Sequence, residues 1–110
     1  MLRLLEALGF VCRWVVDWSD HVWVEARVAG RWVHVDPCEA AVDEPLLYES
    51  WGKKQTYIIA FTQQEVVDVT ENYTSDMEGA RARRDIDQST MEALIADATK
   101  SLQQQEQESP

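Results

Sequence analysis

One histidine and one aspartate stand out as residues that could do chemistry together. His21 opens a run of alternating polar and apolar residues, and Asp36 closes a second such run. A carboxylate within reach of an imidazole selects which ring nitrogen carries the proton and stabilises the charged ring. The two residues are therefore typical of the supporting half of a nucleophilic triad. A histidine and an aspartate on one sheet face are also what an ordinary solvated face presents, and the nucleophile is lacking.

A β-hairpin must bring these two residues together. Residues 21–28 and 31–36 are rich in β-branched and aromatic residues, and Ala29-Gly30 lies between them. Gly30 can adopt the positive φ that a two-residue turn needs. The predicted cross-strand neighbours are Val28 with Arg31, Ala26 with Val33, Val24 with Val35, Trp23 with Asp36, and His21 with Cys38. His21 and Asp36 are then diagonal neighbours, roughly 7–8 Å apart, which long side chains can bridge.

This register divides the hairpin into two faces. The first is predicted to be plain core and carries Val22, Val24, Ala26, Val33 and Val35. The second carries His21, Trp23, Glu25, Trp32, His34 and Asp36. An exposed polar face seldom contains two tryptophans, so the second face is the candidate site.

Periodicity and turn residues predict the other elements. Helices are predicted at 1–8, as the end of a longer amphipathic helix, and at 90–103; strands are predicted at 11–18, 57–61 and 66–69. Ser19-Asp20 is interpreted as a turn, 40–56 as a long loop, and the basic run 80–84 as a solvated face. We divide the chain into a core (1–85), a C-terminal amphipathic helix (86–103) and a disordered tail (104–110).

Composition narrows the class of function. The chain has 110 residues, a formal net charge of −10 and 45% hydrophobic residues, which indicates one globular domain at most. The negative charge argues against nucleic acid and anionic membrane surfaces as partners. No run of apolar residues is long enough to span a membrane. The two cysteines form no disulfide framework, which fits a cytoplasmic or nuclear location.

Four blocks of sequence resemble a known family. The blocks DWSDHVWVE (17–25), RWVHVDPCE (31–39), PLLYESWGKKQTYIIAF (45–61) and EVVDVTENY (65–73) are similar to the transglutaminase-like core of cytosolic peptide:N-glycanase. The resemblance runs from about residue 4 to residue 84. It implies an α+β, transglutaminase-like fold of the papain-like cysteine protease superfamily, with an antiparallel β-sheet and flanking helices. The implied reaction is hydrolysis of the amide that joins an N-linked glycan to asparagine on misfolded glycoproteins.

The resemblance also assigns roles to particular residues. It implies that His21 and Asp36 are two members of a Cys-His-Asp triad, and that Trp23, Glu39 and Trp51 lie near the cleft that binds the chitobiose core of the glycan. The family's catalytic cysteine and its zinc-binding cysteine pairs lie upstream of the matching blocks. We therefore expect an N-terminally truncated chain without its nucleophile, without a metal site or cofactor, and inactive alone. Expected partners are N-glycosylated misfolded proteins, the missing N-terminal half and proteasome-linked factors.

Alternatives remain open for both the site and the function. Cys38 opposes His21 in the predicted register and is an alternative nucleophile, with the partly buried Cys12 as a weaker one. A zinc site built from Cys12, His21, His34 and Cys38 would lack the usual clustered spacing of ligands. The chain as a whole is interpreted as a piece of an amidase. The alternatives are a non-catalytic module that binds glycans or glycoproteins, and an interaction scaffold.

Overall fold

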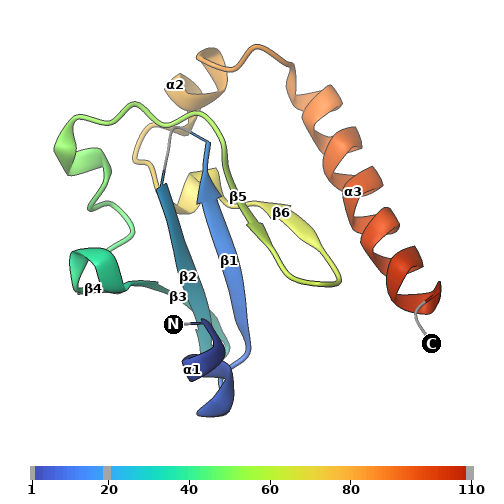
Figure 1. Cartoon of the computed structure of the whole chain (residues 1–110). Coiled ribbons are helices and arrows are strands. Elements are labelled where there is room, and N and C mark those ends of the chain that lie inside the picture. The colour runs from blue at the N-terminus through green and yellow to red at the C-terminus, as the bar shows by residue number, and fades with distance from the viewer. Residues whose placement is uncertain (1, 19–20, 109–110) are drawn as a thin grey trace.

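The protein is an antiparallel sheet with helices at its margins. The computed structural model describes residues 2–18 and 21–108, with side chains as far as Gln105; the predicted turn at Ser19-Asp20 lies outside the described residues. The strands are β1 (Cys12–Asp17), β2 (His21–Val28), β3 (Arg31–Asp36), β4 (Ala41–Val42), β5 (Ile58–Phe61) and β6 (Val66–Asp68). They form one sheet in the order β4-β3-β2-β1-β5-β6, in which every pair is antiparallel (Figure 1). The predicted α+β class is confirmed.

Within residues 2–18 and 21–108, six helical segments accompany the sheet. The α-helices are α1 (Leu2–Ala7), α2 (Met77–Ala82) and α3 (Gln88–Glu108), and the short 3-10 helices are η1 (Pro37–Glu39), η2 (Glu49–Trp51) and η3 (Thr70–Asn72). The helix α3 lies beside β6, where the Thr99 hydroxyl bonds both backbone groups of Val66 (Figure 1). Its backbone continues to Glu108, past the predicted end at 103, because the residues that follow are mostly good helix formers. Among the described residues, no helix has the length and apolarity needed to cross a bilayer.

The predicted register of the hairpin is confirmed for the three predicted pairs nearest the turn. Val28 pairs with Arg31, Ala26 with Val33, and Val24 with Val35. Ala29 and Gly30 have φ values of 50° and 82°, which suit the tight turn that matches the twist of the two strands. The side chains along β2 and β3 therefore alternate between the two faces of the sheet as the sequence predicted.

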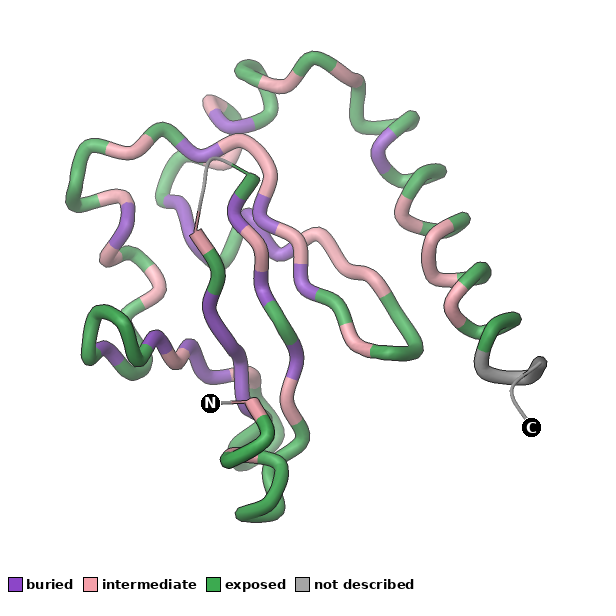
Figure 2. The backbone as a smooth tube through the Cα atoms, viewed as in Figure 1, coloured by how far each residue is buried: buried purple, intermediate pink, exposed green. Residues whose placement is uncertain are grey.

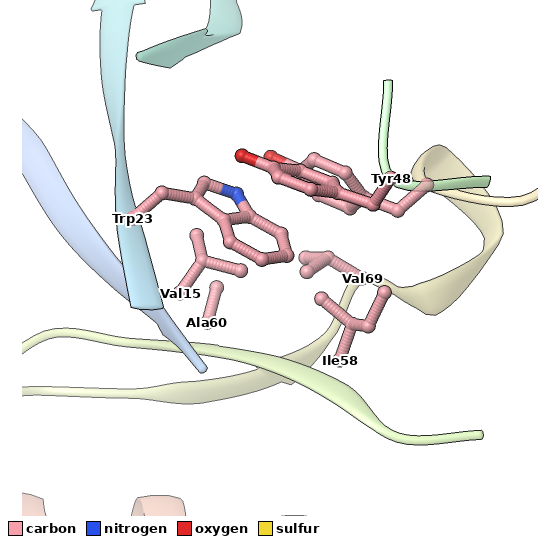
Figure 3. Close-up of a cluster of buried hydrophobic side chains, with 7 residues drawn as sticks. Val15, Trp23, Tyr48, Ile58, Ala60 and Val69 are labelled. Carbon is pink, nitrogen blue, oxygen red and sulfur yellow. The ribbon is translucent and has the colours of Figure 1, made fainter. Parts of the chain in front are cut away.

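The predicted core face is partly buried, but the main core lies on the other face. The main buried cluster lies on the face that was predicted to hold the site: Val15, Trp23, Tyr48, Ile58, Ala60, Val69 and Tyr73 (Figure 3). On the face predicted to be plain core, Val24, Ala26 and Val33 are buried but Val22 is 48% exposed. Tertiary packing explains the difference, because the loop that carries Tyr48 and the segment that carries Val69 and Tyr73 both pack on the face of Trp23, which was predicted to hold the site. Figure 2 shows the buried residues concentrated in the central strands.

The basic run at 80–84 is also not a simple solvated face. Arg83 donates through Nε and Nη2 to the carbonyl oxygen of Gln55, at 3.1 and 2.7 Å. Arg84 donates to the carbonyl oxygen of Thr56 at 2.7 Å and pairs with Asp68 at 3.0 Å. These bonds tie α2 to the end of the long loop and so help to place that loop over the sheet.

Candidate functional site

The hairpin brings His21 and Asp36 into direct contact. His21 is the first residue of β2 and Asp36 is the last residue of β3. Nε2 of His21 lies 2.7 Å from Oδ2 of Asp36, and the exposed fraction of the side chain is 22% for His21 and 0% for Asp36. The imidazole is therefore accessible, while its carboxylate partner is enclosed. This is the pair that the sequence predicted.

The carboxylate of Asp36 accepts four hydrogen bonds from residues that the structure describes. Oδ2 accepts from the Tyr48 hydroxyl at 2.6 Å and from His21. Oδ1 accepts from the backbone N–H groups of Cys38 and Glu39, at 3.1 and 3.4 Å, which makes Asp36 the N-cap of η1. Burial alone would raise the pKa of Asp36, but the hydrogen bonds from Tyr48 and His21 outweigh it and hold that pKa below its ordinary value. Asp36 is therefore an ionised, rigidly held acceptor at neutral pH.

This contact decides which nitrogen of His21 can react. An ionised carboxylate can only accept, so Nε2 carries a proton and donates it to Asp36. Nδ1 makes no hydrogen bond to any residue in the described part of the chain. His21 also lines an open hollow of about 460 Å³, together with Val16, Asp17, Trp18, Val22 and Cys38. The arrangement leaves Nδ1 as the basic nitrogen that can exchange a proton with a reacting group.

Aromatic rings surround the imidazole of His21. The Trp23 and Tyr48 rings are stacked, with centroids 4.3 Å apart and planes at 21° (Figure 3). The ring of Trp51 meets His21 edge-on at 6.2 Å, and its side chain is half-exposed. The rings of Trp23 and Tyr48 lie 5.7 and 5.2 Å from the imidazole. The imidazole therefore has aromatic walls, and Trp51 keeps accessible surface for a ligand.

The three residues expected at a glycan cleft differ in how far their side chains are exposed. Trp51 lies beside His21 and is half-exposed, as a contact residue requires. Glu39 follows Asp36 in η1 and its side chain is exposed, so it is also accessible. Trp23 is only 1% exposed. Tyr48 stacks on the Trp23 ring, so Trp23 forms a wall beside His21, and contact of any of the three residues with a glycan stays a prediction.

Sequence reasoning missed two contributors to the site. Tyr48 comes from a loop whose path the sequence does not predict, and its hydroxyl reaches Asp36. Lys53 comes from the same loop and its Nζ lies 2.6 Å from Oδ2 of the buried Asp17, which lines the hollow. A lone tyrosine and a lysine pair inside a polar loop carry no periodic signal, so no pattern could have found them.

Neither cysteine is paired with Nδ1 of His21 by a hydrogen bond in the described part of the chain. Cys38 is exposed and lines the hollow beside His21. Cys12 is half-buried on β1, where burial and the nearby Glu6 raise the pKa of its thiol. The described residues contain no group of three or more His, Cys, Asp and Glu side chains placed to hold a metal ion, so the geometry gives the zinc alternative no support.

Comparisons with known proteins agree with this fold. Residues 18–109 match the family model described as the Rad4 transglutaminase-like domain. Peptide-N(4)-(N-acetyl-beta-glucosaminyl)asparagine amidase of Gallus gallus is 44% identical over 107 residues, which are 94% of this chain and 16% of that protein. The enzyme of the same name from Homo sapiens is 47% identical over 105 residues, covering 93% and 16%, and that from Arabidopsis thaliana is 38% identical over 100 residues, covering 88% and 14%. The chain thus spans 14–16% of the length of these relatives.

Proposed function

The chain belongs to the Rad4 transglutaminase-like domain family, and from that premise we propose that it provides the histidine and the aspartate of a Cys-His-Asp amidase. The substrate is the amide that joins an N-linked glycan to an asparagine side chain on a misfolded glycoprotein. The observation that carries the proposal is the 2.7 Å contact between Nε2 of His21 and Oδ2 of Asp36. The similarity to the amidases named above supplies the substrate class.

In this mechanism His21 moves the protons. Nδ1 of His21 takes the thiol proton of a cysteine, and the thiolate attacks the carbonyl carbon of the asparagine side chain. When the carbon–nitrogen bond breaks, the imidazolium returns that proton to the departing glycosylamine and a thioester remains. Water, deprotonated by His21, then hydrolyses the thioester and leaves aspartate in the protein. Asp36 stays ionised throughout, orients the ring and stabilises its charged form.

In this proposal the thiolate comes from a cysteine outside these 110 residues, as the resemblance to the family implies. Neither Cys12 nor Cys38 forms a hydrogen bond with His21 in the described part of the chain. Cys38 is the alternative, since it lines the same hollow as His21. The mechanism draws no metal or cofactor from this chain. A reactive thiolate needs a reducing compartment, which is consistent with a cytoplasmic or nuclear location.

In this proposal the accessible residues around His21 bind the glycan. The half-exposed ring of Trp51 offers a face on which a sugar can stack, beside the imidazole that acts on the adjoining amide. The exposed carboxylate of Glu39 accepts hydrogen bonds from sugar hydroxyls. The ligand is the chitobiose core, since its first sugar carries the scissile amide.

A titration of the chain with chitobiose, followed by tryptophan fluorescence, tests glycan binding. We expect saturable binding that is lost in Trp51→Ala and weakened in Glu39→Gln. Trp14→Phe is the matched control, because Trp14 lies on the opposite face of the sheet and should leave binding unchanged. A folded chain that does not bind chitobiose, or a Trp51→Ala variant that binds as well as wild type, would refute the assignment.

Glycan release tests the source of the thiolate. We expect the 110-residue chain to release no glycan from a denatured glycoprotein. Release that is abolished by Cys38→Ser would overturn this expectation and identify Cys38 as the nucleophile.

A non-catalytic glycan-binding module is the second candidate, favoured by the accessible Trp51 beside a histidine with no cysteine partner among the described residues. It predicts chitobiose binding in a full-length protein that releases no glycan.

A further inference from the structure

Behind the His21–Asp36 contact lies a continuous chain of hydrogen bonds. The Tyr48 hydroxyl is 2.6 Å from Oδ2 of Asp36 and also 2.6 Å from Nε2 of His34. Nδ1 of His34 lies 3.3 Å from the backbone N of Glu44. His34 is 3% exposed, and both Tyr48 and Asp36 are fully enclosed. We refer to His34, Tyr48 and Asp36 as the Asp36 network.

The direction of every proton in the Asp36 network follows from one backbone amide. The N–H of Glu44 can only donate, so Nδ1 of His34 must accept and Nε2 of His34 must carry the proton. Nε2–H then donates to the Tyr48 hydroxyl oxygen. That hydroxyl has one proton, which it donates to Asp36. No other assignment leaves each of these close contacts with one donor and one acceptor.

The surroundings agree with this assignment. Burial lowers the pKa of His34, which keeps the ring neutral and free to accept from Glu44. Burial and the bond to Asp36 raise the pKa of Tyr48, so its hydroxyl remains protonated and able to donate. The hydrogen bonds to Asp36 hold its pKa low, and an ionised carboxylate is the acceptor at which such a chain must end.

We propose that Tyr48 and His34 are positioning residues, which orient the Asp36 carboxylate and so keep the free nitrogen of His21 at Nδ1. With Tyr48, Cys38 and Glu39 each donating to it, the carboxylate cannot turn away from Nε2 of His21. Its role toward His21 rests on the proposed function, but the network is testable without any substrate or cysteine.

The same network couples the site to the long loop. Tyr48 immediately precedes η2, whose last residue is Trp51. The Tyr48 and Trp51 rings contact each other edge-on at 5.3 Å, and Trp51 in turn contacts His21. Tyr48 therefore contacts both Asp36 and the half-exposed ring of Trp51. The loop serves both the orientation of the base and the surface offered to the ligand.

The test is nuclear magnetic resonance of the labelled 110-residue chain. Long-range proton–nitrogen correlations give the tautomer of each histidine, and the carbon-detected titration of Asp36 gives its pKa. In the wild-type chain we expect both His34 and His21 to carry the proton on Nε2. In Tyr48→Phe, which keeps the ring stacked on Trp23, we expect the Asp36 pKa to shift upward.

Matched variants separate positioning from packing. Tyr57→Phe removes a hydroxyl that donates to another carboxylate, that of Asp85 at 2.6 Å, and should leave the Asp36 titration unchanged. In His34→Leu we expect the Tyr48 hydroxyl proton to exchange faster with water. His34→Gln should restore slow exchange, because its amide can donate where Nε2–H did.

Two outcomes would overturn the proposal. One is a His34 ring with its proton on Nδ1 in the wild-type chain, which is decided even where a variant fails to fold. The other is an Asp36 pKa that is the same in wild type and Tyr48→Phe. Failure of chitobiose binding would refute the proposed function and leave both measurements standing.

Discussion

Replacement of Asp36 by asparagine should reverse the proton arrangement of the site while nearly preserving its shape. The carbonyl oxygen of the new side chain keeps the Oδ1 position, because the backbone N–H groups of Cys38 and Glu39 can only donate to it. The amide nitrogen then occupies the Oδ2 position and donates to Nε2 of His21. The imidazole proton must move to Nδ1, so the nitrogen that faces a reacting group can no longer accept a proton.

The structure sets the size of the effect on stability. Two charge-assisted hydrogen bonds at Oδ2 become neutral ones, at a cost of roughly 1 kcal/mol each, and the Tyr48 hydroxyl proton is left without an acceptor. Burial of a neutral amide costs less than burial of a carboxylate, which offsets part of the loss. We expect a net loss of about 2 kcal/mol in the free energy of unfolding, which corresponds to a Tm lower by about 10 °C for a domain of this size.

The loss should depend on pH in a defined direction. The pKa of Asp36 is lower in the folded protein than in the unfolded chain, where it is about 3.9. Ionised Asp36 therefore contributes its full stability above pH of about 4, and the contribution is lost as the pH falls through the folded-state pKa. Asparagine does not titrate. The difference in unfolding free energy between wild type and Asp36→Asn should be largest at neutral pH and shrink in acid.

Three measurements check this reasoning. Urea unfolding of both proteins at neutral pH and in acid gives the stability difference, and nitrogen chemical shifts give the His21 tautomer. In an assembled amidase the wrong tautomer should lower kcat by about 10⁴-fold, by analogy with other triads. An Asp36→Asn chain that is as stable as wild type at neutral pH, or that retains the proton on Nε2 of His21, would refute the argument.

Two further predictions concern buried and surface carboxylates away from the reacting nitrogen. Arg13 and Glu25 form a buried ion pair at 2.5 Å, and the Tyr73 hydroxyl donates to the same carboxylate. Arg13→Met should lower the free energy of unfolding in urea by about 3 kcal/mol, because it leaves the Glu25 charge buried without its partner, whereas the double variant Arg13→Met, Glu25→Leu should recover most of that loss. Equal losses in the single and double variants would contradict this prediction. The backbone N–H and hydroxyl of Ser75 lower the pKa of Glu49, so its contribution to stability should be present at neutral pH and disappear as the pH falls through the folded-state pKa. Thermal melts of Glu49→Gln should therefore differ from wild type at neutral pH and converge with it in acid, and a difference that persists in acid would count against that bond.

The sequence alone determined the hairpin and with it the central pair. Side chains alternate strictly along residues 21–28 and 31–36, and a turn with two positive φ values admits only one register. Register is a local property, since it depends on neighbours in the chain and on a period of two. The contact between His21 and Asp36 follows from it directly, which is why it could be predicted without any knowledge of the rest of the fold.

Only the tertiary structure decided which face of the hairpin holds the main buried cluster. Both faces carry large apolar residues, so the pattern did not discriminate between them. The choice was made by the loop that brings Tyr48 onto Trp23, a loop held at its far end by Arg83 and Arg84. The bonds from these two arginines to the carbonyl oxygens of Gln55 and Thr56 each join residues 28 positions apart, and no local periodicity encodes them.

The proton arrangement at Asp36 is likewise a tertiary property. The sequence shows a histidine two residues before Asp36 and a tyrosine twelve residues after it, but not that one backbone amide, at Glu44, orders both. A hydrogen bond depends on distances of a few tenths of an ångström and on the angle at the donor. Such geometry exists only once the loop has packed, so the sequence supplied the His21–Asp36 pair and the folded loop supplied its orientation.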